Sequence, residues 1–159
     1  DVYKRQASVL YKDKAWLFSG HSGAGKSTHT NMWKELFNTP VINGDLNLID
    51  INTTDGIPVV IGIPWCGTSG IYTSRSYPLG GITFIKKDIT DQVRRIDGDD
   101  AVLSIAQRMI SPCWNTRLLE NNLAASEKIA AGITVFRLCC TKNPSSAFLM
   151  KEEIDNEYH

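Results

Sequence analysis

One segment constrains this chain more than any other: residues 20–27 read Gly-His-Ser-Gly-Ala-Gly-Lys-Ser. They fill every fixed position of the pattern G-x-x-x-x-G-K-[ST]. The strand-like run Ala15–Ser19 precedes them, and apolar residues at helical spacing follow between Ser27 and Phe37. In such a strand-loop-helix context, glycines let backbone N–H groups turn inward, and the helix adds partial positive charge at its amino end. The segment therefore predicts a loop that binds the phosphates of a nucleotide.

The side chains of this segment suggest separate roles. Lys26 would bridge the β- and γ-phosphates, Ser27 would place its hydroxyl on Mg²⁺, and Thr28 would support Ser27 or contact a phosphate. We interpret His21 as a surface or loop-bracing residue, and His29, one turn into the helix, as a residue on the helix flank. The predicted nucleotide-binding residues are Gly20, Ser22, Gly23, Ala24, Gly25, Lys26, Ser27 and Thr28.

A phosphate-bound magnesium ion also needs an acid from a neighbouring strand end. Asp45 is the candidate, because it follows the apolar pair Val41 and Ile42, where a second strand should run beside the strand before the loop. The other interpretation is a turn residue, since Asn, Gly and Asp all favour tight turns. The first interpretation makes Ser27 and Asp45 the metal ligands, and Lys26 and Asp45 the catalytic residues.

Composition and charge argue against several classes of function. The 159 residues include 17 basic and 17 acidic side chains and hold no basic tract, unlike a surface that follows nucleic-acid phosphates. The longest apolar runs, such as Ile57–Ile63, are too short to cross a bilayer, and no signal peptide opens the sequence. We therefore expect a cytoplasmic protein with neither nucleic-acid nor membrane partners.

The remaining pattern predicts one α/β domain over residues 1–159, with a mixed β-sheet and flanking helices. Because the chain begins at Asp1 rather than Met, we interpret residues 1–6 as a foreign or truncated leader. Two hairpins are expected, the first before the loop and the second in the middle of the chain. Their strands are Ala7–Tyr11 with Ala15–Ser19, and Leu46–Ile51 with Ile57–Ile63. Further strands are expected at Gly81–Lys86, Gln92–Ile96 and Thr134–Cys139, and helices at Ser27–Phe37, Asp97–Arg108, Asn115–Ala130 and Ser145–Glu153.

Residues 64–78 have neither helical nor strand periodicity, and we expect a long functional loop there. Arg75, its one cation, is either an exposed surface residue or a contact for an acceptor phosphate. Trp65, Cys66 and Gly67 would shape an acceptor pocket, or the Trp would simply pack. The four cysteines are expected to be reduced thiols, since no spacing supports a zinc site. The acidic stretch from Asp88 to Asp100 is expected to form a solvated edge and a helix cap.

With these residues in view, the sequence resembles the C-terminal domain of HPr kinase/phosphorylase, in particular uncharacterised bacterial members. That family belongs to the P-loop kinases akin to phosphoenolpyruvate carboxykinase. The blocks that carry the resemblance are FSGHSGAGKSTHTNMW at Phe18–Trp33, VINGDLNLID at Val41–Asp50, the block at Gly62–Lys87, and ITVFRLCCTKNPSSA near the end.

The resemblance implies a mixed sheet with the phosphate loop at one rim, ATP with Mg²⁺ or Mn²⁺ as cofactor, and homo-oligomers. It also implies phosphoryl transfer to a hydroxyl acceptor, either a small molecule or a protein Ser. Gly23, Gly25, Lys26 and Ser27 match the family's nucleotide loop, and Asp45 matches the second acid of a pair. Gly44 stands where many relatives have the first acid, which looks like the base that receives the acceptor's proton. The features that dock HPr are not recognisable, so we do not predict HPr as substrate.

Three interpretations follow. The first is an ATP-dependent kinase in which Asp45 serves the metal and doubles as the base. The second is a non-catalytic nucleotide-binding or switch module that lost its base. The third, another small P-loop kinase, fits less well, because those enzymes place a parallel strand before the loop and carry an Arg-rich lid.

Overall fold

A computed structural model describes residues 2–4, 6–20, 25–43, 46–51, 54–61, 76–107 and 116–157 of the chain. Within these ranges the chain forms nine strands and four helices. The strands are β1 (Val2–Lys4), β2 (Gln6–Tyr11), β3 (Lys14–Ser19), β4 (Val41–Asn43), β5 (Leu46–Asp50), β6 (Val59–Ile61), β7 (Ser76–Lys87), β8 (Gln92–Ile96) and β9 (Thr134–Cys140). The helices are α1 (Lys26–Phe37), α2 (Gly98–Ala106), α3 (Thr116–Gly132) and α4 (Ser145–Glu157). None of these helices is long and apolar enough to cross a membrane.

The strands form one mixed sheet in the order β1-β5-β6-β7-β3-β2-β4, with β9 also paired to β7 and β8 paired to β9. β3, β7 and β9 are parallel to one another, whereas β2 and β3 form an antiparallel hairpin. Lys12 and Asp13 turn this hairpin with φ values of 51° and 60°, as a two-residue turn with both residues left-handed requires. The predicted α/β fold with a mixed sheet and flanking helices is therefore confirmed.

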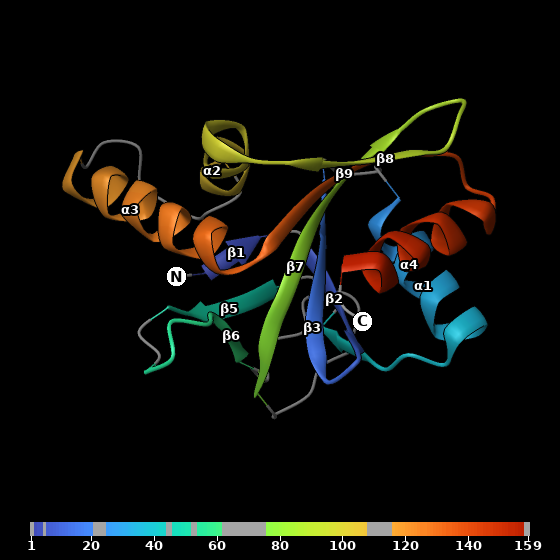
Figure 1. Ribbon diagram of the computed structural model, residues 1–159, viewed down its shortest axis with the longest axis horizontal. Coiled ribbons are helices and arrows are strands. Elements are labelled where there is room, and N and C mark those ends of the chain that lie inside the picture. Colours follow the sequence, from blue (N-terminus) through green and yellow to red (C-terminus); the bar gives the residue numbers. More distant parts are fainter. Residues whose placement is uncertain are drawn as a thin grey trace.

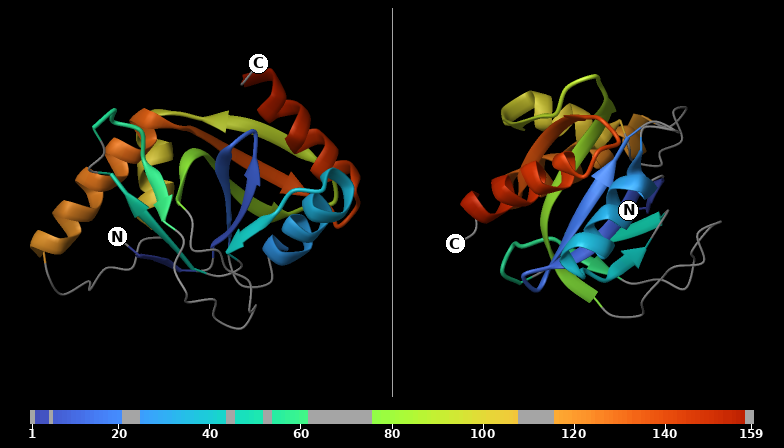
Figure 2. Two further views of the ribbon diagram at one scale, coloured as in Figure 1. Left: turned by 90° about the horizontal axis from the view of Figure 1, so that it is seen from below. Right: turned by 90° about the vertical axis from the view of Figure 1, so that its right-hand side faces the viewer.

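Helices cover both faces of the sheet (Figure 1): α1 and α4 lie on one face, and α2 and α3 on the other. In the right-hand view of Figure 2, α1 and α4 are both turned toward the viewer. Each face has its own apolar cluster. Trp33 of α1 and Met150 of α4 belong to one, and Ile105 of α2 and Ile129 of α3 belong to the other. The apolar faces of the helices are thus buried against opposite sides of the sheet.

Trp16 fixes the contact between β3 and β7, because its ring lies against the glycine pair in the middle of β7. A Cβ added at Gly80 would lie 2.7 Å from ring atoms of Trp16. A Cβ added at Gly81 would lie 2.7 Å from the carbonyl oxygen of Thr134 and 2.9 Å from Trp16. Real Cβ contacts are longer than this, so the absence of a side chain at both positions lets the buried indole cross the strand.

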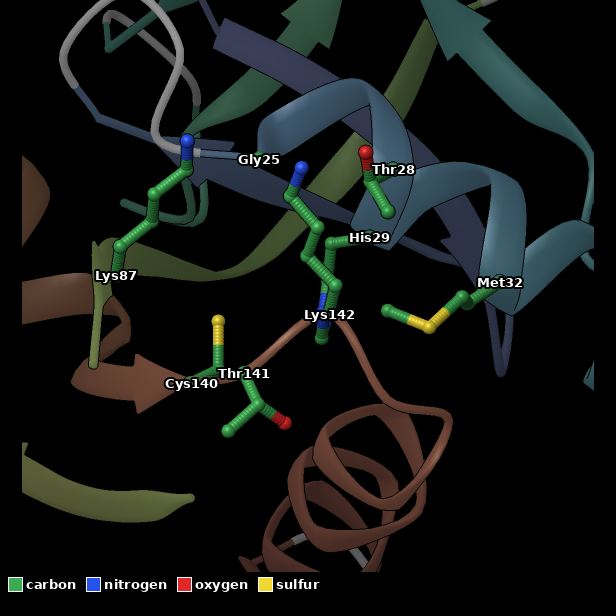
Figure 3. A pocket seen from close by; sticks show the side chains of 8 residues that line it. All are labelled: Gly25, Thr28, His29, Met32, Lys87, Cys140, Thr141 and Lys142. Atoms are coloured by element: carbon green, nitrogen blue, oxygen red, sulfur yellow. The ribbon is translucent and has the colours of Figure 1, made fainter. Parts of the chain in front are cut away.

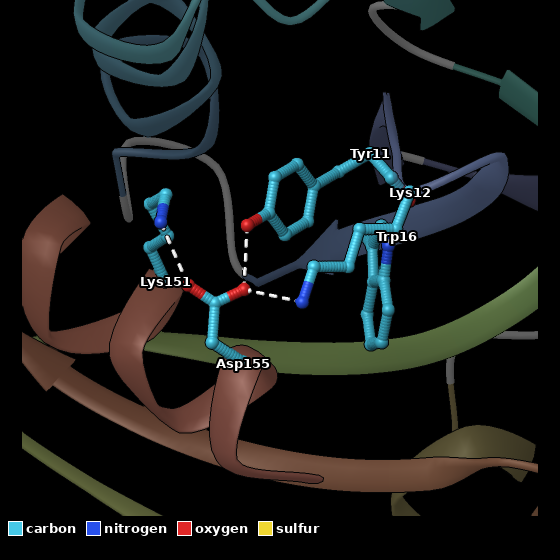
Figure 4. A network of polar contacts seen from close by, with 5 residues as sticks. All are labelled: Tyr11, Lys12, Trp16, Lys151 and Asp155. Carbon is cyan, nitrogen blue, oxygen red and sulfur yellow. Dashed lines mark hydrogen bonds and ion pairs between the residues drawn. The ribbon is translucent and has the colours of Figure 1, made fainter. Parts of the chain in front are cut away.

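The C-terminal helix is fastened to the tip of the β2–β3 hairpin by Asp155 (Figure 4). Its carboxylate accepts a hydrogen bond from the Tyr11 hydroxyl at 2.5 Å and forms ion pairs with Lys12 at 2.9 Å and Lys151 at 2.7 Å. Partial burial acts to raise its pKa, but hydrogen bonds from these three partners hold the pKa of Asp155 well below its usual range. α4 continues to Glu157, beyond the predicted end at Glu153, and Glu157 is itself paired with Arg95 of β8 at 3.3 Å.

Several expectations about the elements need correction. β7 begins at Ser76, so the last three residues of the expected loop 64–78 are strand, paired with β6. Residues 62–75, with Trp65, Cys66, Gly67 and Arg75, lie outside the described residues. Val2–Lys4 of the expected leader pairs with β5 as β1. Of the cysteines, Cys139 and Cys140 are free thiols as predicted, and Cys66 and Cys113 lie outside the described ranges.

Candidate functional site

The predicted phosphate loop starts where β3 ends and finishes where α1 begins. Gly20, directly after β3, is buried. Gly25 is the N-cap of α1 and has a φ of 100°, in the left-handed region that favours glycine. A Cβ at Gly25 would meet no atom within 4 Å, so backbone conformation rather than crowding calls for glycine. His21 and the predicted nucleotide-binding residues Ser22, Gly23 and Ala24 lie outside the described residues.

The first turn of α1 carries the other predicted loop residues. The Lys26 ammonium donates a hydrogen bond to the Gly20 carbonyl oxygen at 3.3 Å, which joins the two ends of the loop. Ser27 and Thr28 are exposed. Gly25 has no side chain to cap the helix, and the first turn holds no acid. The amino end of α1 therefore keeps its partial positive charge, and an external anion would be favoured there.

The predicted acid follows β4, whose place in the sheet differs from expectation. β4 does not lie beside β3, because β2 lies between them and pairs with both. Since both pairings are antiparallel, β4 runs in the same direction as β3, and Asn43 ends at the same edge of the sheet as Ser19. Neighbouring strands are about 4.8 Å apart, so β4 ends roughly 10 Å from β3. Gly44 and Asp45 themselves lie outside the described residues.

No group of three or more His, Cys, Asp or Glu side chains suited to a metal ion occurs in the described part of the chain. Ser27, in contrast, places an exposed hydroxyl in the first turn of α1. A hydroxyl is an oxygen ligand of the kind that Mg²⁺ prefers, and the ion keeps several waters and substrate oxygens in addition. The first turn of α1 thus fits a magnesium ion that is held largely by a bound nucleotide.

A small pocket, partly open to solvent, lies beside this helix end (Figure 3). It is lined by Gly25, Thr28, His29 and Met32 of the loop and α1, by Lys87 at the end of β7, and by Cys140, Thr141 and Lys142 at and after the end of β9. Because β3, β7 and β9 are parallel, their carboxyl ends meet at one edge of the sheet. Ligands of α/β proteins bind at such an edge.

His29 forms the buried wall of this pocket. It is 1% exposed, and its ring packs edge-on against Phe18, with the centroids 4.7 Å apart. Its Nε2 accepts a hydrogen bond from Trp33 Nε1 at 3.0 Å, while its Nδ1 has no partner among the described residues. Burial lowers the pKa of His29 to about 4, although the charge of Asp91 acts in the opposite direction. The imidazole is therefore neutral near pH 7, and its proton is on Nδ1.

Sequence reasoning missed the pocket. It placed His29 on the flank of the helix, yet the residue is buried. It left Lys87 and Lys142 without a role, although each stands at or just after the end of a predicted strand. It also assigned Asp91 to a solvated edge, whereas that carboxylate accepts hydrogen bonds from Thr141 and Ser145. Strand direction was the missing information, because only parallel strands bring these ends together.

A comparison with solved structures finds a similar fold in the Hpr(Ser) kinase/phosphatase from Coxiella burnetii, with a TM-score of 0.50. The match covers 99% of this chain and 95% of that one at 9% sequence identity. No family model matches the sequence, and no curated protein matches it either. The likeness is therefore one of fold, a mixed α/β architecture, and it extends over nearly the whole of both chains.

Proposed function

We propose that this protein binds ATP with Mg²⁺ at the amino end of α1 and transfers the terminal phosphoryl group to a hydroxyl acceptor. The observation that carries the proposal is the junction of β3 and α1. There a complete G-x-x-x-x-G-K-[ST] sequence meets a helix whose N-cap is a glycine and whose first turn holds no acid. The fold shared with a kinase/phosphatase supports the same conclusion.

Each residue of the junction has a part in this proposal. Backbone N–H groups between Gly20 and Thr28 hold the phosphates, and Lys26 exchanges its hydrogen bond to the Gly20 carbonyl for phosphate oxygens. Ser27 and Asp45 would hold a magnesium ion, which would supply charge neutralisation for the transferred phosphoryl group. Asp45 also receives the acceptor's proton, since Gly44 offers no carboxylate. The rate then depends on positioning and charge neutralisation, with little covalent chemistry by the protein.

Calorimetric titration with ATP, with and without Mg²⁺, tests the binding step. Lys26→Ala should weaken ATP binding by roughly tenfold or more, because it removes a charge-assisted contact. Lys34→Ala is the matched control, since Lys34 is exposed in the last turn of the same helix. If the wild-type protein binds no ATP, or if both variants bind it equally, nucleotide binding at this loop is wrong.

A non-catalytic nucleotide-binding module is the second candidate, and Gly44 in place of an acid is the observation that favours it. Release of ADP separates the two. A kinase forms ADP in a metal-dependent reaction that Asp45→Asn abolishes, whereas a binding module holds ATP without turnover. Turnover that Asp45→Asn leaves unchanged would refute the role of Asp45 while leaving nucleotide binding intact.

A further inference from the structure

Two ammonium groups lie beside the predicted phosphate loop but outside its sequence motif. Lys87 ends β7 and Lys142 follows β9, and Figure 3 shows both side chains directed toward the part of the pocket near Gly25. Both side chains are exposed, and neither has an ion-pair partner within the described ranges. Two cations that face one helix amino end add to its positive potential.

The backbone around Lys142 is held in place by Asp91. The Asp91 carboxylate accepts hydrogen bonds from the Thr141 backbone N–H at 2.7 Å, from the Thr141 hydroxyl at 3.0 Å, and from the Ser145 hydroxyl. These bonds fix the residue before Lys142 and the first residue of α4. The negative charge of Asp91 is thereby engaged with three donors in the turn, and the Lys142 side chain remains directed toward the pocket.

A third donor comes from the buried wall. The proton on His29 Nδ1 has no acceptor among the described residues, and the side chain lines the pocket. Leaving a buried donor unsatisfied costs roughly 1–3 kcal/mol, so such a group calls for an explanation. Because Nδ1 has almost no accessible surface, an acceptor oxygen in the pocket would satisfy it only after a small shift of the lining side chains. The buried donor is therefore an observation independent of the two lysines, and it points to the same kind of ligand.

We propose that Lys87, Lys142 and His29 form a second phosphoryl-group subsite beside the amino end of α1. Lys87 and Lys142 supply the charge, and the N–H of His29 supplies a donor in the buried wall. Thr28, in the same pocket, joins this subsite to the predicted loop. The inference rests on the proposed function for the source of its ligand. That source is either the bound nucleotide's own phosphate chain or a separate phosphate, free or carried by a phosphorylated molecule.

Calorimetric titration of the full chain with ATP and Mg²⁺ tests whether the subsite binds the nucleotide's own phosphate chain. Lys87→Ala and Lys142→Ala should each weaken binding by roughly tenfold, as loss of a charge-assisted contact does. Lys86→Ala is the matched control, because Lys86 is the exposed neighbour on the same strand but does not line the pocket. Its affinity for ATP should stay within roughly twofold of the wild type, since an exposed lysine outside the pocket makes no phosphate contact.

A titration with inorganic phosphate tests whether the subsite binds a separate phosphate. The experiment uses the Lys26→Ala variant, in which phosphate binding at the predicted phosphate loop is weakened. In this variant, inorganic phosphate should still raise the midpoint of thermal unfolding. Adding Lys87→Ala and Lys142→Ala should abolish that rise, while adding Lys86→Ala should leave it. If the ATP titrations are unchanged and this phosphate effect is lost, the subsite takes a separate phosphate. If the pocket variants match Lys86→Ala in both experiments, the subsite does not exist.

Failure of the two proposals can be told apart. A wild-type protein that binds no ATP refutes the proposed function, and the phosphate experiment then decides the subsite alone. A protein whose ATP binding needs Lys26 but neither Lys87 nor Lys142, and whose phosphate response needs neither lysine, keeps the proposed function and loses the subsite.

Discussion

The buried imidazole of His29 makes the stability of the fold depend on pH in a window that lies mostly above the range in which ordinary carboxylates titrate. The pKa of His29 is about 4 in the folded protein, against 6.5 for an unperturbed imidazole. Between these values the unfolded chain binds a proton that the folded chain does not, so stability falls as the pH is lowered. The difference of 2.5 pKa units corresponds to about 3 kcal/mol over the whole window, of which about 2 kcal/mol is lost between pH 7 and pH 5.

Urea denaturation of the wild type and of His29→Gln at pH 7, 6 and 5 measures this loss. The Gln amide oxygen can still accept the hydrogen bond that Trp33 donates to His29, so the variant removes the titrating group with little other change. It should be less stable at pH 7 but lose much less stability than the wild type by pH 5. His21 and His159 remain in the variant, so its pH dependence shows what the other histidines contribute. Equal slopes in the two proteins would refute a neutral, buried His29.

Other changes test the packing that supports the site. Gly81→Ala should lower the free energy of unfolding by about 1–3 kcal/mol, because the new Cβ would lie 2.7 Å from the Thr134 carbonyl oxygen. Chemical denaturation measures this loss, and an unchanged midpoint would contradict the packing described. Asp155→Asn should lower stability by about 1 kcal/mol at low salt and by less in concentrated salt, whereas Asp97→Asn, at an exposed ion pair, should have little effect. Burial raises the pKa of the Cys140 thiol from 9.0 to about 11. Alkylation of Cys140 at pH 8, followed by mass spectrometry, should therefore be roughly 100-fold slower in the folded protein than in the unfolded chain. Equal rates would show that the thiol is not buried.

Local chemistry was enough to predict the strand that ends at Ser19 and the helix that begins after Gly25. The helix ends as expected, with Asn38 in a left-handed conformation that closes it. The buried face of that helix was harder to predict. Leu36 fits the apolar spacing but is 41% exposed, whereas His29 and Thr30 are buried. Hydrophobicity alone misassigns this face, because an imidazole that accepts a hydrogen bond from Trp33 can be buried at moderate cost.

The arrangement of the strands needed information that a single sequence does not contain. Two apolar runs separated by a short turn predict a hairpin, and both expected hairpins form. Which distant strands pair is decided by packing, so the position of β2 between β3 and β4 was not foreseen. β7 was predicted only from Gly81 onward, because Pro78 and Gly80 are poor strand formers whose place in the sheet depends on long-range partners.

The contact of Trp16 with the glycine pair of β7 has a consequence for how this fold can vary among relatives. Position 80 accepts a side chain only where the residue at position 16 is smaller than an indole, so changes at these two positions should be inherited together. At position 81 the neighbouring backbone carbonyl cannot shrink, and glycine should persist there even where Trp16 has been replaced. Joint changes at positions 16 and 80, together with an unchanged glycine at position 81, would be evidence for this contact.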